Sequence, residues 1–431
     1  MRTHWNYIGF FFLLVLFVAG ACNKPDDNSR PNIYLDAPTE YTNFLVGDTM
    51  KVSGAVFHTK PISSLKIAIR DEMNHAVSAP KYLYPSSSSY HFDVDYIIDE
   101  AGLATGTYTL AITVSDGQTA TNFFRNIRIT GLDQYFERLM VFCRPGILKT
   151  YVYAIDSAWN LQNVLNLNHG FVDTEINSGD RKLFLVKPEP SILYAFDLDD
   201  PVPEPWLLAG PPYPLFNDVF ISDQLTYIAS ANGEIKGLDK LGDIVFVTAQ
   251  DPDTIPVLLH RHQNIILSYC ERRGGPQKLI RQHFIGTGVA RDFTTITFSV
   301  AAMFDADEEF CLLLGNYEGY SMIYKYQVDE NYLGGHTNLP GGNIRDAVKI
   351  SPDDYLIALD EGIYHYSYAS GYISAWRPDI DVEIMAFDET RMLLYCAKGH
   401  NVTVFRADNG DLVQEIEMPY PVYDLHIQYN I

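Results

Sequence analysis

Two histidines separated by a single residue stand in the segment His260-Arg261-His262. In an extended strand, residues i and i+2 lie on one face, so both imidazoles point the same way and are placed to bind one metal ion. A metal site needs further ligands, and no third one stands near this pair in the sequence. We therefore expect a polar pair at the end of a strand, and we predict no metal ligand.

Acidic residues gather in four short stretches, which raises the question of calcium binding or acid–base chemistry. Calcium needs six to eight oxygen ligands from a sharp loop containing glycine, and none of the stretches has the D-x-[DN]-x-[DN]-G pattern. Two neighbouring carboxylates can raise one another's pKa, but no partner residue is identified for them here. We expect solvated loops at 197–200, 305–309, 353–354 and 379–383.

The usual catalytic motifs are absent from the sequence. It contains no G-x-S-x-G, no H-E-x-x-H, no Walker-type loop and no G-x-G-x-x-G that follows a strand and opens a helix. We therefore predict no catalytic residue and no cofactor. Catalysis remains an open alternative, because residues from distant segments can also form a site.

Aromatic residues outside the strand-like runs are the candidates for ligand contact. Exposed aromatic side chains on loops bind sugars and peptides by stacking and apolar contact. Prolines stiffen the segment 204–214 (EPWLLAGPPYP), which reduces the entropy lost on binding. Each aromatic residue has the alternative of packing between sheets. The predicted ligand-binding residues are Trp159, Trp206, Tyr213, Tyr317, Tyr320, Tyr332, Trp376 and Arg377.

The charge balance limits the classes of partner. The 431 residues include 31 Lys and Arg against 54 Asp and Glu, a net charge of −23. Nucleic-acid binding needs an excess of cations that displaces counterions from the phosphates. Nucleic acid is therefore excluded as a partner, whereas the 47% of hydrophobic residues is ordinary for a folded chain.

The N-terminus has the pattern of an export signal. Arg2 and His4 precede an apolar run at 7–18, which at 12 residues is shorter than the roughly 20 needed to span a membrane. Ala19-Gly20-Ala21-Cys22 resembles the lipobox of bacterial lipoproteins. That resemblance implies a lipoprotein signal peptide at 1–21, cleavage before Cys22, and a lipid on its thiol. The alternative is an ordinary secretory peptide.

A polar tether at 22–30 follows the predicted lipidation site. Its Lys24-Pro25-Asp26-Asp27 resembles the export signal that places Bacteroidota lipoproteins on the outside of the outer membrane. The alternative is a generic linker. Lipid chains on Cys22 would bury methylene groups at about 0.8 kcal/mol each and hold the protein on a membrane.

Residues 31–131 alternate apolar and polar residues in strand-length runs. The clearest run, Tyr108 to Val114, is followed by Asp116-Gly117, which is typical of a tight turn into the next strand. This stretch resembles bacterial Ig-like and PKD-like domains. The resemblance implies a small sandwich of two antiparallel sheets.

Residues 132–431 contain an internal repeat. A strand such as Tyr151–Asp156 (YVYAID) or Ile192–Asp197 (ILYAFD) recurs seven times. The copies end at 156, 197, 239, 282, 327, 367 and 406, so the intervals are 41, 42, 43, 45, 40 and 39 residues. An apolar strand precedes each copy, a further strand lies before most of these, and another strand follows each copy. Four strands per unit of this length are typical of β-propeller blades.

The repeat also predicts how the domain closes. It begins on a second strand at 138–143 and ends on a first strand at 422–428, so the last strand would complete the first blade. The fold prediction is all-β: an Ig-like sandwich followed by a seven-bladed propeller closed by the C-terminal strand. The thiols that lie in apolar runs are predicted to be buried; they are Cys143, Cys270, Cys311 and Cys396.

Lipobox, tether, PKD-like module and propeller together resemble the PKD-like lipoproteins of Bacteroidota. The resemblance implies a non-enzymatic, surface-exposed lipoprotein of the outer membrane. Such a protein would capture a peptide or glycan, or dock on a TonB-dependent starch-utilisation-type transporter and its substrate-binding lipoprotein.

Two alternatives remain. One is a propeller hydrolase or lyase acting on polysaccharide or peptide, which two carboxylates and a histidine around the central channel would favour. The other is a periplasmic assembly or sensor propeller. A face lined by aromatic residues and amides would favour binding.

Overall fold

The computed structural model shows a chain built of strands. Every regular element among the described residues is a β-strand, so the all-β prediction is confirmed, and no described helix is long and apolar enough to cross a membrane. The predicted signal peptide and Cys22 lie outside the described residues. The structure describes residues 30–71, 77–78, 80–98, 103, 105–210, 215–222, 225–285 and 287–430.

The chain divides into two compact units. The first comprises Met1–Asp99 and Thr105–Thr130, and the second comprises Glu100–Ala104 and Gly131–Ile431. Every residue of the candidate site described below belongs to the second unit.

The described part of the first unit forms two sheets. One has the order β1-β3-β6 and the other β2-β8-β7-β4-β5. Alternate residues are buried on each sheet, for example Phe92, Val94 and Tyr96 on β6, which is the pattern of two sheets packed face to face. The strand bounds are β1 Asn32–Ala37, β2 Asn43–Leu45, β3 Thr49–Phe57, β4 Ser64–Arg70, β5 Lys81–Leu83, β6 Ser89–Ile97, β7 Gly106–Ser115 and β8 Ala120–Thr130.

The described part of the second unit forms seven four-stranded antiparallel sheets. Their first strands are β12 Thr174–Asn177, β16 Phe216–Ser222, β20 Thr254–His262, β24 Ser299–Asp305, β28 Ile344–Lys349, β32 Ile384–Asp388 and β36 Val422–Asn430. The second strands are β9 Tyr135–Gly146, β13 Lys182–Lys187, β17 Leu225–Ser230, β21 Ile265–Arg272, β25 Phe310–Tyr317, β29 Asp354–Leu359 and β33 Leu393–Lys398.

The third strands carry the sequence repeat. They are β10 Lys149–Asp156, β14 Ile192–Asp197, β18 Ile235–Leu238, β22 Lys278–Phe284, β26 Tyr320–Gln327, β30 Gly362–Ser367 and β34 Asn401–Arg406. The fourth strands are β11 Leu161–Leu167, β15 Glu204–Leu208, β19 Ile244–Val247, β23 Ala290–Ile296, β27 Tyr332–Leu339, β31 Tyr372–Arg377 and β35 Leu412–Glu417.

The seven first strands form a closed ring. Each contacts the first strand of the next sheet, from β12 through β16, β20, β24, β28 and β32 to β36, and β36 contacts β12 in turn. Sheets that share a ring of inner strands in this way form a β-propeller. The second unit is therefore a β-propeller.

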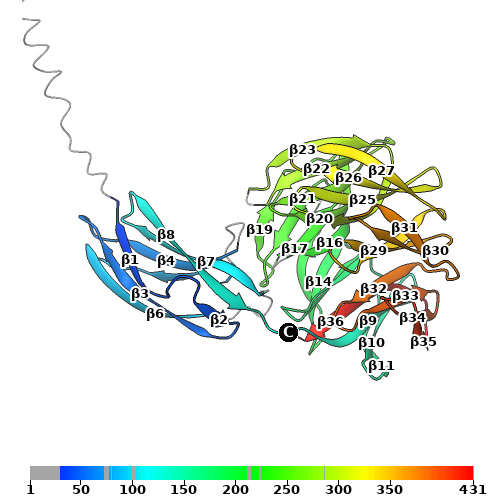
Figure 1. Cartoon of the computed structure of the whole chain (residues 1–431), viewed down its shortest axis with the longest axis horizontal. Coiled ribbons are helices and arrows are strands. Elements are labelled where there is room, and N and C mark those ends of the chain that lie inside the picture. Colours follow the sequence, from blue (N-terminus) through cyan, green and yellow to red (C-terminus); the bar gives the residue numbers. More distant parts are fainter. Residues whose placement is uncertain are drawn as a thin grey trace, which may run out of the picture. The chain divides into compact units, whose positions relative to one another are not determined.

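The C-terminal strand completes the first sheet, as the repeat predicted. β36 pairs antiparallel with β9, with Leu425 opposite Val141, and the sheet order is β11-β10-β9-β36. Figure 1 shows the red strand β36 beside β9. Both ends of the unit thus pair in one sheet, which removes two open edges.

The core lies between successive sheets. Leu139 and Val141 of β9 pack against the sheet of β33 and β34, whereas Met140 and Phe142 pack against the sheet of β13 and β14. The second strands are therefore buried on both faces, which explains why they are continuous apolar runs in the sequence. The four described cysteines are all buried free thiols, as predicted.

Candidate functional site

Aspartates recur at equivalent positions of the inner strands. β16, β28 and β36 each contain a β-bulge, and the residue that follows the bulge is Asp218, Asp346 or Asp424. Asp173 has the corresponding place just before β12, where its carbonyl accepts the N–H of Val186. A bulge changes the direction of the following side chain, so four sheets present a carboxyl group in the same way.

These carboxyl groups connect three of the described inner strands, and the segment just before a fourth, to the next inner strand. Asp173 accepts the backbone N–H of Val219, and Asp218 accepts that of Leu259, both at 2.8 Å. Asp424 accepts a 2.6 Å hydrogen bond from the Thr174 hydroxyl. Each hydrogen bond joins two neighbouring sheets, so the aspartates first of all have a structural role.

His426 and Glu175 add two groups that do not join backbones in this way. The Nε2 atom of His426 lies 3.2 Å from Oδ2 of Asp424, and Nδ1 lies 3.5 Å from Oε1 of Glu175. The side chains of His426 and Glu175 are 17% and 30% exposed, so solvent reaches both. We call the set Asp173, Thr174, Glu175, Asp218, Asp346, Asp424 and His426 the inner-strand cluster.

The surroundings shift the pKa values in this cluster in opposite directions. Burial raises the pKa of Glu175, Asp218 and Asp346 to about 7. Burial and the nearby Asp218 raise the pKa of Asp173 well above its ordinary value. These carboxyl groups are therefore partly or fully protonated near neutral pH.

Asp424 and His426 form the charged pair of the cluster. Burial opposes ionisation of Asp424, but the charge and hydrogen bond of His426 lower its pKa below the ordinary value. Burial also opposes protonation of His426, but Asp424 and Glu175 raise its pKa to about 9. An imidazolium beside proton-sharing carboxyl groups can bind hydrogen-bonding ligands or transfer a proton.

Exposed apolar residues lie next to this cluster. Val172 and Tyr423 are exposed and directly precede Asp173 and Asp424 in the chain. The β9–β10 hairpin adds Ile147 and Leu148, which are 86% and 71% exposed. We call Ile147, Leu148, Val172 and Tyr423 the apolar rim.

Close contacts hold the rim together. A Cβ on Gly170 would meet the Ile147 carbonyl oxygen at 2.5 Å, so only glycine lets the hairpin approach the segment before Val172. The Arg144 guanidinium lies 4.0 Å from the ring centroid of Phe171 and 4.5 Å from that of Tyr423. These contacts connect both sides of the rim through one cation.

The structure places the predicted ligand-binding residues in strands more often than we expected. Trp159 lies in the turn after β10, and Tyr213 lies outside the described residues. The expectation that the others lie outside strands is wrong, because they occur in β15, β25, β26, β27 and β31. These residues are Trp206, Tyr317, Tyr320, Tyr332, Trp376 and Arg377.

The tryptophans pack between sheets. Trp206 contacts Phe184 and Trp376 contacts Phe405, with ring centroids 5.1 and 6.0 Å apart. Trp159 packs against the core cluster that contains Tyr395. Two of the tryptophans lie in fourth strands, which are half-buried. The mixed composition of these strands does not show the alternation of apolar and polar residues from which strands are predicted.

Arg377 and the tyrosines have different surroundings. Arg377 is paired with Asp379 at 2.8 Å and donates to the Gly410 carbonyl. Tyr317 and Tyr320 face each other at the ends of β25 and β26, and Tyr332 begins β27 of the same sheet. The structure therefore groups these three tyrosines, whereas the tryptophans come from three other sheets. A role of all these residues in ligand binding stays a prediction.

The two histidines of the 260–262 segment do have a third partner in space. Asp305, from the stretch expected to be a solvated loop, contacts both rings. Among the described residues, His260, Asp305 and Cys311 are the group whose ligand atoms lie close enough together to hold a metal ion.

Sequence reasoning missed the inner-strand cluster because its residues are up to about 250 positions apart. One signal was present: the pattern x-Asp-apolar recurs as Asn217-Asp218-Val219, Arg345-Asp346-Ala347 and Tyr423-Asp424-Leu425 at one phase of the repeat. Aligning the repeats on their first strands would have revealed it.

Comparisons with known proteins bear on the fold alone. No family model matches the chain, and no curated protein matches it. Among solved structures, it is similar to a quinonprotein alcohol dehydrogenase-like protein from Bacteroides thetaiotaomicron, with 11% identity, a TM-score of 0.46, and coverage of 92% of this chain and 99% of that one.

Two further similar structures are propellers. The Dos1 propeller has 11% identity, a TM-score of 0.45, and coverage of 67% of this chain and 87% of that one. The propeller domain of Cps50 (Swd1) from Myceliophteria thermophila has 11% identity, a TM-score of 0.46, and coverage of 58% and 87%.

Proposed function

We propose that the protein is a non-enzymatic binding protein of the cell envelope. In this proposal the first unit is an Ig-like sandwich, and the seven sheets are the blades of a seven-bladed propeller. The propeller captures a ligand where the inner-strand cluster meets the apolar rim.

One observation carries this proposal: the partly exposed carboxyl groups of Glu175 and Asp424 lie beside the exposed side chains of the apolar rim. Glu175 and Asp424 offer acceptors for N–H groups, while Tyr423, Leu148 and Ile147 offer apolar contact. A peptide with a basic side chain or a free amino terminus presents both features. A neutral glycan fits less well, because the predicted tryptophans do not converge on this place.

Peptide binding can be measured on the full-length chain by calorimetry with a library of short peptides of varied charge. We expect basic peptides to bind and acidic peptides not to. Leu148→Ser and Tyr423→Ser should weaken binding at least tenfold, whereas Leu412→Ser on the outer strand β35 should leave it unchanged. Equal affinity in all three variants, or a preference for acidic peptides, would exclude the proposed site.

The location belongs to the same proposal. The lipobox at Cys22 and the acidic tether support a lipid anchor in the outer membrane, with the protein on the outside as an accessory of a TonB-dependent uptake system. Palmitate labelling with Cys22→Ser as control tests the anchor, and protease shaving of intact cells tests the outward orientation. A labelled but protected protein would favour a periplasmic assembly or sensor propeller.

An enzyme is the second candidate, and a specific observation favours it. Glu175 has a pKa of about 7 and lies beside the imidazole of His426 and the carboxylate of Asp424. Such a group can serve as a general acid or base in a hydrolase or lyase acting on polysaccharide or peptide. Glu175→Gln would then abolish turnover of a substrate while retaining its binding, whereas a pure binding protein shows no turnover in either form.

A further inference from the structure

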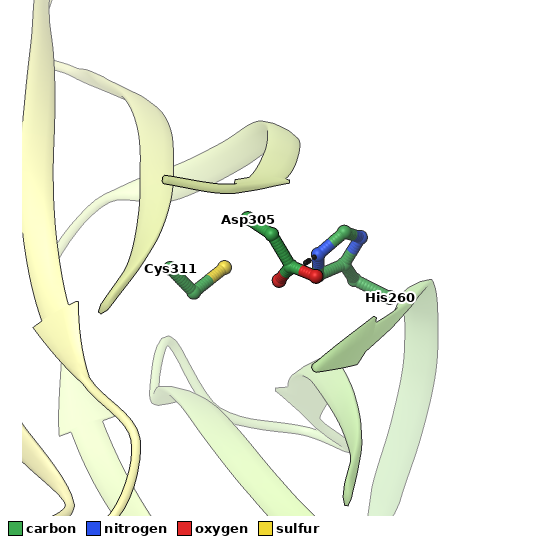
Figure 2. A group of neighbouring side chains, drawn as sticks. All are labelled: His260, Asp305 and Cys311. Atoms are coloured by element: carbon green, nitrogen blue, oxygen red, sulfur yellow. Dashed lines mark hydrogen bonds and ion pairs between the residues drawn. The ribbon is translucent and has the colours of Figure 1, made fainter. Parts of the chain in front are cut away.

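A thiol, a carboxylate and two imidazoles meet between the sheets of β20 and β24. His260 and His262 lie on the same face of β20, Asp305 is the last residue of β24, and Cys311 is the second residue of β25. Figure 2 shows the Asp305 carboxylate between the thiol and the His260 ring. These residues belong neither to the inner-strand cluster nor to the apolar rim.

Both imidazoles contact the same oxygen atom. Nε2 of His260 lies 2.9 Å from Oδ1 of Asp305, and Nδ1 of His262 lies 2.8 Å from the same atom. One ligand atom from each of His260, Asp305 and Cys311 lies within 4.8 Å of the others. In a tetrahedral zinc site neighbouring ligand atoms are about 3.5 Å apart, so a movement of about 1 Å would complete the geometry.

We propose that His260, Asp305 and Cys311 bind one divalent transition-metal ion, with zinc as the preferred metal. His262 acts as a positioning residue that holds the Asp305 carboxylate. The fourth coordination position is left to a water molecule.

The chemistry of these donors selects the class of metal. Imidazole nitrogen and thiolate sulfur are ligands of zinc and of its first-row neighbours, whereas calcium and magnesium take oxygen ligands. A hydrogen-bonded inter-sheet contact alone would need no thiol. Cys311 is fully buried, and one ligand atom each of Asp305 and His260 lies within 4.8 Å of its sulfur.

The surroundings of the site are ordered as those of metal ligands commonly are. Nε2 of His262 lies 3.1 Å from the Glu308 carbonyl, which fixes the ring. The Tyr355 hydroxyl donates to the Asp305 carbonyl at 3.2 Å. The Asp305 carboxylate itself is held by Nδ1 of His262, and ligating carboxylates are usually hydrogen-bonded in this way. The Asp305 side chain is 45% exposed, which gives an ion a path from solvent.

Metal binding has a defined proton balance. The Asp305 carboxylate already accepts hydrogen bonds from both histidines, so it binds the ion without losing a proton. Cys311 is a free thiol and therefore carries a proton before the ion binds. The sulfur–hydrogen bond breaks, a sulfur–metal bond forms, and the proton is released to solvent.

One nearby cation opposes binding and provides a sharp test. Lys349 donates from Nζ to the backbone carbonyl of Asp305 at 2.5 Å, so its positive charge lies beside a proposed ligand. An ammonium group at this position repels a dication. Lys349→Met should therefore tighten metal binding several-fold, an effect that a purely structural histidine–aspartate contact cannot produce.

Cobalt is the probe for the first experiment. The full-length chain, with Cys22→Ser in every sample, is stripped with a chelator and titrated with Co²⁺. We expect one ion per chain, visible d–d bands of tetrahedral cobalt, and a thiolate-to-cobalt charge-transfer band. Cobalt binding should release about one proton per thiolate formed, and zinc should then displace the cobalt without further proton release.

Variants assign the ligands. Cys311→Ser should abolish the charge-transfer band, and His260→Gln should weaken cobalt binding at least tenfold. Two matched controls should change nothing: Cys396→Ser removes another buried thiol, and His365→Gln removes a histidine whose Nε2 lies 2.8 Å from Asp354 without a thiol nearby. Cys311→Ala provides a second test in case the serine variant does not fold. No stoichiometric uptake, or a charge-transfer band that persists without Cys311, overturns the proposal.

Discussion

Oδ2 of Asp346 accepts a hydrogen bond of 2.6 Å from the backbone N–H of Met385, which lies on the inner strand of the next sheet. The other oxygen accepts the N–H of Ala347 at 2.7 Å. One carboxyl group thus binds the backbone next to its own bulge and also the backbone of the neighbouring inner strand. This relationship recurs between other sheets and explains why aspartate follows the bulges of β16, β28 and β36.

Removing this acceptor should destabilise the propeller. Asp346→Ala leaves the buried N–H of Met385 without its partner, which should lower the free energy of unfolding by about 1–3 kcal/mol. Asp346→Asn keeps one oxygen acceptor and should cost less. Urea unfolding followed by tyrosine fluorescence measures both, with Glu417→Ala on the exposed strand β35 as control. Equal stability of the alanine variant and the control would mean that the contact does not hold the sheets together.

Stability should decrease as the pH rises from about 5 to 9. Glu175, Asp218 and Asp346 have a pKa of about 7 in the folded chain. Because about 4 is usual in an unfolded chain, the folded state retains protons that the unfolded state releases between these values. His426, with a pKa of about 9, extends the decrease from about pH 6.5 upwards.

Two carboxylates with lowered pKa have the opposite effect at acid pH. Asp305 and Asp424 contribute stability above about pH 4, and this is lost as the pH falls through their folded pKa values. We therefore expect the highest melting temperature near pH 4, where the two opposing effects meet. Glu175→Gln should flatten the decrease between pH 5 and 7, and His426→Gln the decrease between pH 7 and 9. A melting temperature that rises from pH 5 to 8 would contradict the assigned shifts.

Closure of the ring should dominate the stability of the propeller. Leu425 of the closing strand is 4% exposed and packs between the first and last sheets, whereas Leu412 on β35 is 55% exposed. Leu425→Ala should cost about 2–4 kcal/mol, because the cavity left behind adds to the lost burial. Leu412→Ala should change the free energy of unfolding by less than about 0.5 kcal/mol. Denaturant midpoints of the two variants compare them directly.

The repeat made the propeller predictable, because the third strand of every sheet packs in the same way. Apolar residues therefore recur at alternate positions in each copy. The copies at 151–156, 322–327 and 401–406 fall in β10, β26 and β34. The same periodicity located the closing strand at 422–428. Local alternation and a constant interval are properties that a sequence displays without knowledge of contacts.

The candidate sites were not predictable in the same way. Thr174 and Asp424 are 250 positions apart, and His260 and Asp305 are 45 apart, yet each pair lies within 3 Å. Closure of the ring creates the first contact, and the packing of the successive sheets of β20 and β24 creates the second. The local sequence around one residue of a pair does not indicate the other residue. The tryptophans were misplaced for a related reason, since a half-buried outer strand and a binding loop have similar compositions.

Trp376 and Tyr320 offer the test that separates packing from binding among the predicted aromatic residues. Trp376 contacts Phe405 and belongs to the core between two sheets, whereas Tyr320 is 73% exposed at the start of β26. Trp376→Ala should lower the free energy of unfolding by about 2–3 kcal/mol. Tyr320→Ala should change it by less than about 0.5 kcal/mol. If Tyr320 contacts ligand, its variant loses affinity with unchanged stability. Loss of affinity in Trp376→Ala is informative only at temperatures where that variant is fully folded.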